Sequence, residues 1–311
     1  MADAVLVPPS PPKAGGSVKD DFTAFDFTLY AIVIFAWGFS WYAIRLQLGV
    51  VDPVVSVAWR FWLAAALMFV WVVASGRRIV FPVRQHMLFA GLGVFLFSTN
   101  FCLFYFAGFY LVSGLLAVIF STASILNVIN AAIFLRERPK PKIVLAALMG
   151  AVGLALIFLP SIDVLHLGAG TLIGLAISLV ATQSFSLGNM ISVRVQRLGL
   201  PLVSSSAYGM AYGAAFMTLI AAATGRPFTF DTSATYMGSL VYLAVIATVI
   251  AFASYLTLLR RIGASRAAYI TVIFPLAALA VSTYAEGYQW TLSAIAGLVL
   301  VIAGNLLMIR K

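Results

Sequence analysis

The sequence predicts an all-α integral membrane protein with ten transmembrane helices, arranged as two inverted five-helix repeats with both termini in the cytoplasm. Three observations predict this fold: the composition, the length of the apolar runs and the distribution of basic residues. Of the 311 residues, 63% are hydrophobic and only 9% are charged. A soluble domain carries roughly a quarter charged residues, so this chain lacks the polar surface of an ordinary soluble enzyme. With a single cysteine, Cys102, it is not a disulfide scaffold either.

The apolar runs have the length of single membrane crossings. A helix of about 20 apolar residues crosses a hydrocarbon layer of ~30 Å. A proline- and glycine-rich segment, residues 1–26, precedes these runs and is typical of a flexible cytoplasmic tail, without the apolar segment of a signal peptide. The predicted spans are residues 27–48, 53–74, 85–109, 113–135, 141–160, 168–193, 201–224, 235–259, 266–285 and 290–309.

The basic residues predict the orientation of these spans. Of the 19 lysines and arginines, only Arg45 and Arg226 fall on one side, Arg60 lies inside the second span, and the other sixteen fall on the opposite side. Loops rich in lysine and arginine stay in the cytoplasm. The net charge of +10 therefore indicates topology. A nucleic-acid partner or a patch for lipid head groups is the less favoured alternative.

Matching residues in the two halves predict an internal repeat. Arg45 and Arg194 close the first and sixth spans, and Glu137 and Glu286 follow the fourth and ninth, each pair 149 residues apart. Because five spans are an odd number, the second half enters the membrane from the opposite side, as in many transporters. The expected units are residues 27–160 and 168–309.

A second set of small residues supports the repeat. Ala146 and Gly153 in the fifth span resemble Gly297 and Gly304 in the tenth, both pairs being seven residues apart at an offset of 151. Coincidence is the alternative in so apolar a chain.

Residues for catalysis or metal binding are scarce. The sequence has no glycine-rich phosphate loop, two histidines, His86 and His166, and no carboxylate inside a span. We therefore expect no enzyme activity, no metal and no cofactor. The nine acidic residues lie in the tail, in loops or at span ends, which disfavours proton coupling through a central carboxylate.

Uncharged polar and aromatic side chains within the spans are the candidate substrate contacts. In the sixth span Ser178, Thr182, Ser186 and Asn189 share one helical face. Such residues often act only as hydrogen bonds between helices. As a set they suit a cavity for a small amphipathic metabolite. The residues expected to line it are Trp41, Asn100, Tyr105, Ser121, Asn127, Ser186, Asn189, Tyr255 and Tyr269.

Two further residues have predicted roles. Arg60 lies about seven residues, roughly 10 Å, from the start of the second span at Pro53. It either meets a substrate carboxylate, or extends to the outer interface or pairs with Asp52 or Glu286. Pro275 removes a backbone hydrogen bond in the ninth span and is the expected hinge.

Together these residues resemble the EamA-type branch of the drug/metabolite transporter superfamily, most closely its bacterial aromatic amino-acid exporters. The resemblance covers residues 27–309. It rests on Trp37-Gly38-Phe39-Ser40 before Arg45, Pro53, Arg60-Phe61, Asn100, Glu137, and Gly263-Ala264-Ser265-Arg266-Ala267 leading to Pro275 and Glu286. One departure is Leu126, which stands in the fourth span where the ninth has Pro275.

The resemblance implies ten helices, with spans 1, 3, 4, 6, 8 and 9 around a cavity and spans 5 and 10 bracing it. It further implies export of amino acids and related metabolites across the bacterial inner membrane by alternating access. We therefore expect a secondary transporter or facilitator of broad specificity for aromatic and other neutral amino acids, present as a monomer or weak homodimer surrounded by lipid. Export of drugs, organic cations or other small metabolites is the alternative. A membrane-embedded enzyme or a channel is a remote one.

Overall fold

The computed structural model describes residues 23–134, 136, 141–158, 169–262, 267 and 269–309. All regular structure within these residues is helical. The residues before 23, together with Glu137, His166 and Arg266, lie outside the described part. The elements are α1 (Ala24–Arg45), α2 (Pro53–Ala74), α3 (Val83–Val94), η1 (Phe95–Thr99), α4 (Asn100–Ala107), α5 (Ser113–Ser121), α6 (Ala123–Phe134), α7 (Pro141–Phe158), α8 (Ala169–Arg197), α9 (Leu202–Ala223), α10 (Ala234–Val241), η3 (Tyr242–Ile250), α11 (Ala251–Ile262), α13 (Ile270–Ala285) and α14 (Leu292–Ile309).

The described helices are those of a multi-pass membrane protein. Seven helical segments are long and apolar enough to cross a membrane. The remaining apolar helices of the described part are shorter and fall at the predicted fifth, ninth and tenth spans: Val144–Ile157, Ile270–Ala285 and Leu292–Leu307. The count of ten crossings and the cytoplasmic position of both termini therefore stay predictions.

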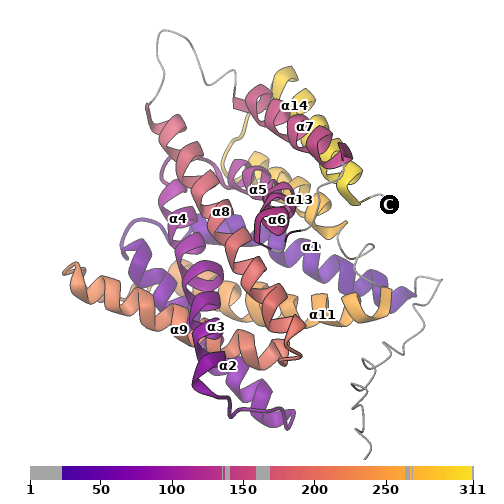
Figure 1. Ribbon diagram of the computed structural model, residues 1–311. Helices are drawn as coiled ribbons and strands as arrows, with labels where there is room; N and C mark the ends of the chain where they lie inside the picture. The colour runs from indigo at the N-terminus through magenta and orange to yellow at the C-terminus, as the bar shows by residue number, and fades with distance from the viewer. Residues whose placement is uncertain are drawn as a thin grey trace, which may run out of the picture.

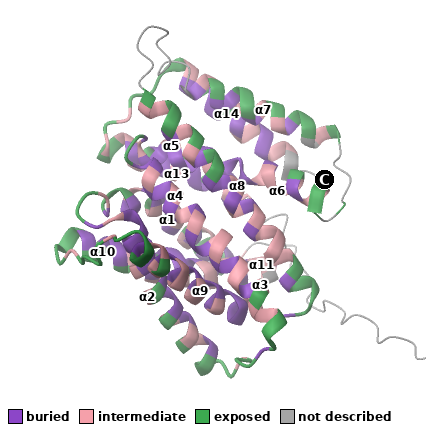
Figure 2. Ribbon diagram, turned by 60° about the vertical axis from the view of Figure 1, so that its left-hand side comes forward, coloured by how far each residue is buried: buried purple, intermediate pink, exposed green. Residues whose placement is uncertain are grey.

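The helices form a central group with one helix pair on each flank (Figure 1). The pair α2 and α9 packs on one side, and the pair α7 and α14 packs on the other. Between them lie α1, α5, α8, α11 and α13 with the broken segment α3–η1–α4. The pair α7 and α14 carries many exposed residues (Figure 2), among them the large apolar side chains of Val144, Val152, Ile295 and Val299. Such an apolar surface is suited to lipid.

Several helix contacts recur when each element is exchanged for its counterpart in the other half. The contact of α1 with α13 corresponds to that of α8 with α6. Similarly, α1 packs on η3 and α11, as α8 packs on η1 and α4. The packing of η1 on α9 is matched by that of η3 on α2. The two halves thus use equivalent surfaces to hold each other.

Glycines allow α7 and α14 to approach closely. A Cβ atom on Gly153 would lie 2.6 Å from the carbonyl oxygen of Gly297, and one on Gly304 would lie 2.8 Å from that of Ala146. These are the four small residues that mark the repeat in the sequence. Close backbone approach is the usual role of small residues between membrane helices.

Two π-helical segments occupy equivalent places in the two halves. Thr99 at the end of η1 and Thr248 near the end of η3 are 149 residues apart. In each segment a hydroxyl donates to the carbonyl five residues earlier: Ser98 to Gly93 at 2.7 Å and Thr248 to Leu243 at 2.7 Å. The sequence predicted uninterrupted α-helices here, because no proline or other strong helix breaker occurs in either segment. Such wide turns are often found at functional sites.

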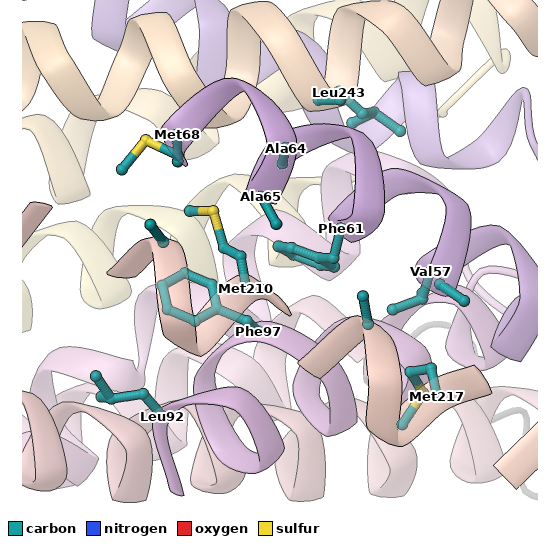
Figure 3. Close-up of a cluster of buried hydrophobic side chains, with 14 of the residues drawn as sticks. Val57, Phe61, Ala64, Ala65, Met68, Leu92, Phe97, Met210, Met217 and Leu243 are labelled. Carbon is teal, nitrogen blue, oxygen red and sulfur yellow. The ribbon is translucent and has the colours of Figure 1, made fainter. Parts of the chain in front are cut away.

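The largest buried apolar cluster lies where α2 meets α9 and η1. Phe61 and Met68 from α2, Met210 and Met217 from α9, and Phe97 from η1 are all buried (Figure 3). Unbranched methionines fill the spaces between the rings. This cluster holds one flank of the central group in place.

Candidate substrate site

Aromatic rings from several elements meet in the central group. The Trp41 ring lies with its centroid 4.9 Å from that of Phe104 and 5.4 Å from that of Phe120. Phe120 in turn contacts Phe185 of α8 at 4.6 Å and Phe274 of α13 at 6.1 Å. This ring cluster therefore joins both halves of the chain. Tilted and edge-on rings at these separations attract each other and would attract an aromatic ligand.

Trp37 extends the ring cluster to the eighth span. Its ring centroid lies 5.5 Å from that of Tyr255 and 6.4 Å from that of Phe274. Of the predicted site residues, Trp41 and Tyr255 thus belong to the ring cluster, whereas the role of Tyr269 stays a prediction. Phe120, Phe185 and Phe274 were missed, because apolar rings in a membrane span carry no signal that separates a site from lipid contacts.

Amide side chains connect α6 with α8 beside the ring cluster. Asn130 donates to Gln183 at 3.2 Å and to Ser186 at 2.8 Å, and Gln183 donates back to Asn130. Asn189 donates to Asn127 at 3.2 Å. The predicted residues Asn127, Ser186 and Asn189 therefore bond across one helix seam, the amide seam. Asn130, which is 3% exposed, and Gln183 belong to it but were not among the predicted site residues.

Asn100 presents a buried acceptor with no partner. It is 1% exposed, and its Oδ1 atom has no hydrogen-bond donor within the described residues. Asn100 lies one helical turn before Phe104, a member of the ring cluster, so the two share a face of α4. An unpartnered buried acceptor costs about 1–3 kcal/mol, which a donor on a ligand would offset.

Tyr105 and Ser121 do not join the ring cluster. Tyr105 is fully buried among the apolar residues around α2, and its hydroxyl donates to Gln47. The Ser121 hydroxyl donates to the carbonyl of Val118 in its own helix. Both remain predicted site residues, but in this conformation they contact other surroundings.

The predicted fourth span is interrupted at Thr122, between α5 and α6. The hydroxyls of Ser121, Thr122 and Ser124 donate to carbonyls three residues earlier in the chain. Hydroxyl bonds of this kind compete with the helix and bend it. We expected a break only in the ninth span, yet α13 continues through the buried Pro275. The hinge role of Pro275 stays a prediction.

An ion pair joins the end of α1 to the end of α13. Glu286 accepts hydrogen bonds from the backbone N–H and the hydroxyl of Ser113, at the start of α5. Arg45 lies 3.9 Å from the same carboxylate and donates to the carbonyl of Gly108 at 2.6 Å. Three elements from both halves are therefore tied together at this end, which we call the Glu286 junction.

These features define a class of protein: a multi-pass helical membrane transporter built from two similar halves around a shared centre. The model of the EamA-like transporter family matches residues 27–159 and again residues 172–310. The chain belongs to this family.

Two relatives match this chain over most of its length. The chain is 26% identical to protein PagO of Salmonella typhimurium over 270 residues, covering 84% of each chain. It is 25% identical to an uncharacterized transporter of Archaeoglobus fulgidus over 281 residues, covering 90% of this chain and 97% of the relative. A solved crystal structure matches with a TM-score of 0.64 at 16% identity, covering 92% of this chain and 96% of the other. That structural likeness concerns the fold alone.

Proposed function

We propose that this protein is a secondary transporter or facilitator that exports amino acids, aromatic and other neutral ones, across the bacterial inner membrane. The observation that carries the proposal is the ring cluster with the unpartnered Asn100 acceptor at its side, placed where the two halves meet. Rings suit an aromatic or aliphatic side chain, and an amide oxygen suits an ammonium group.

Transport would proceed by exchange between two conformations without covalent chemistry. In the present conformation the amide seam and the Glu286 junction are closed by hydrogen bonds between the halves. Opening either one exposes polar groups that water or substrate then satisfies. Substrate enters from the cytoplasm, the halves rock, and release follows at the other face.

Export of organic cations is the alternative, and the buried charges weigh against it. Among the described residues the buried acid is Asp26, which already pairs with Arg261. Glu286, the acid of the Glu286 junction, is likewise engaged, because it accepts hydrogen bonds from Ser113. A cation carrier needs an acid that is available to its substrate.

Reconstitution tests the proposal. Purified protein in liposomes is given labelled phenylalanine, tryptophan and leucine, with and without a pH gradient, beside a labelled organic cation. We expect saturable amino-acid flux and counterflow. Flux of the cation alone would favour the alternative, and no saturation would favour a channel.

Tryptophan substitution in α8 locates the site. Ser186→Trp and Asn189→Trp place bulk in the amide seam, and we expect both to abolish flux. Val180→Trp is the matched control, because Val180 on the same helix is 58% exposed on the outside. Unchanged flux in the two seam variants would remove the amide seam from the transport path.

A further inference from the structure

Arg60 is a buried charge without a counter-ion in the part of the chain that the structure describes. Asp26 and Arg60 are the charged residues that are buried in the described part of the chain, 1% and 3% exposed. Asp26 forms an ion pair with Arg261, whereas Arg60 has no carboxylate of a described residue within 4.0 Å. An unpaired charge at this depth is costly, and intramembrane charges that persist are usually functional.

Neither acid that we considered as a partner for Arg60 is available. Asp52 caps the start of α2 through the N–H of Val54 and pairs with Arg226 at 2.5 Å. Glu286 is held by Ser113 and Arg45 in the Glu286 junction. In this conformation Arg60 therefore pairs with neither Asp52 nor Glu286, and its extension to the outer interface stays a prediction.

Several donors around Arg60 lack acceptors. The Nη2 atom of Arg60 donates to the Thr248 hydroxyl at 3.3 Å, while its Nε and Nη1 atoms have no partner. Tyr105, which follows Phe101 by one turn of α4, donates through its hydroxyl to Oε1 of Gln47. The Nε2 atom of Gln47, which is 1% exposed, also has no partner. An acceptor-rich group is what this cluster lacks.

The surrounding rings select the kind of acceptor. The guanidinium carbon lies 4.4 Å from the ring centroid of Phe101 and 5.2 Å from that of Phe61. Stacking on a ring face stabilises the charge but leaves the N–H donors in the guanidinium plane free. Such donors match the two oxygens of a carboxylate. The apolar walls and the single positive charge suit a monoanion.

We propose that Arg60 and Gln47 bind the carboxylate of the substrate near the end of the path that the Glu286 junction closes. The inference deepens the proposed function and rests on it for the transport step. Gln47 follows Arg45 by two residues, so the carboxylate site lies beside that junction. The site selects compounds that bear one carboxylate, and its positive charge excludes organic cations.

Binding of a simple carboxylate tests the site without requiring transport. Thermal unfolding of the purified protein is followed with benzoate, with its neutral isostere benzamide, and with chloride. A ligand that binds only the folded protein raises Tm with its concentration. We expect benzoate to raise Tm, and Arg60→Gln to abolish that rise. Arg226→Gln, which removes a charge already paired with Asp52, is the matched control and keeps the rise.

Gln47→Leu keeps the inference testable if Arg60→Gln does not fold. Loss of one of the donors is expected to weaken benzoate binding about tenfold. An equal rise of Tm with benzamide or chloride, or an unchanged benzoate response in both variants, would overturn the carboxylate site.

Transport separates this inference from the proposed function. In liposomes we expect wild-type protein to prefer phenylalanine over phenylalaninamide, and Arg60→Gln to lose that preference. If Arg60→Gln transports phenylalanine as fast and as selectively as the wild-type protein, the carboxylate site is wrong and the proposed transport function stands. If benzoate binding depends on Arg60 but the wild-type protein transports no amino acid, the carboxylate site stands and the proposed function is wrong.

Discussion

The indole Nε1 of Trp37 donates a hydrogen bond of 3.2 Å to the backbone carbonyl of Ala247, inside the π-helical segment of the other half. The second half repeats this relationship, because the Ser184 hydroxyl donates at 3.0 Å to the carbonyl of Phe95 in the first π-helical segment. In both cases a side chain from the first helix of one half bonds to the widened turn in the third helix of the other.

These two bonds should make similar contributions to stability. Trp37→Phe keeps a ring and loses the donor, and Ser184→Ala loses the second donor. We expect each to lower the free energy of unfolding by about 0.5–1.5 kcal/mol, measured by thermal unfolding in detergent. Trp290→Phe is the control, since Trp290 donates to Thr283 at an exposed site. A loss in Trp290→Phe as large as in the other two would mean that any tryptophan donor matters equally.

The Glu286 junction should control access to the single cysteine. Glu286→Gln keeps the shape of the side chain and removes its charge, so Arg45 loses its ionic partner. We expect this end to open more often and the buried Cys102 to react faster with a polar thiol reagent. Asp231→Asn, at an exposed loop site where Asp231 bonds Ser233, is the control. An unchanged rate in Glu286→Gln would show that this junction does not limit opening.

The crossing of α7 and α14 should tolerate no added side chain. Gly297→Val places carbon atoms against the backbone of Gly153 and the side chain of Ile157. Overpacking of this kind costs about 1–3 kcal/mol, visible as a lower Tm. Gly238→Ala is the matched control in α10, because a Cβ atom there meets nothing within 4 Å. Equal Tm values for the two variants would contradict the close approach.

The amide seam should depend most on Asn130. Asn130→Leu removes its bonds to Gln183 and Ser186 and leaves both without these partners. We expect a loss of about 1–3 kcal/mol in the free energy of unfolding and an altered flux. Ser192→Ala, which removes an exposed bond to Gln196, should change neither quantity. If flux is unaffected in Asn130→Leu, the seam has a purely structural role.

The helices were largely predictable, and the interruptions within them were not. Residues 53–74 were predicted and α2 is Pro53–Ala74, because proline favours the first helical position and apolar residues fill one crossing. The sixth span was predicted to end at residue 193, but α8 continues to Arg197. Its last turns contain basic residues, which are suited to a helix C-terminus in the polar interface.

The candidate site was predictable in its chemistry and less so in its arrangement. Periodicity placed Asn127, Ser186 and Asn189 on helical faces, and the structure brings them to one seam. Periodicity did not reveal that Tyr105 turns toward α2, since Phe101, Phe104 and Phe106 place rings on several sides of α4. For the same reason Phe120 could not be distinguished from a ring that contacts lipid.

The sequence by itself determined that this chain is a helical membrane protein with two similar halves, because hydrophobicity, span length and charge distribution act locally or along the whole chain. Only the tertiary structure decided which polar groups find partners. Asn127 and Asn189 bond to each other, whereas Arg60 and Asn100 keep unpartnered atoms. Hydrogen bonds between helices depend on distances of a few ångströms between residues far apart in the chain. Only the folded chain therefore shows which of its few charged groups are paired and which, like Arg60, are not.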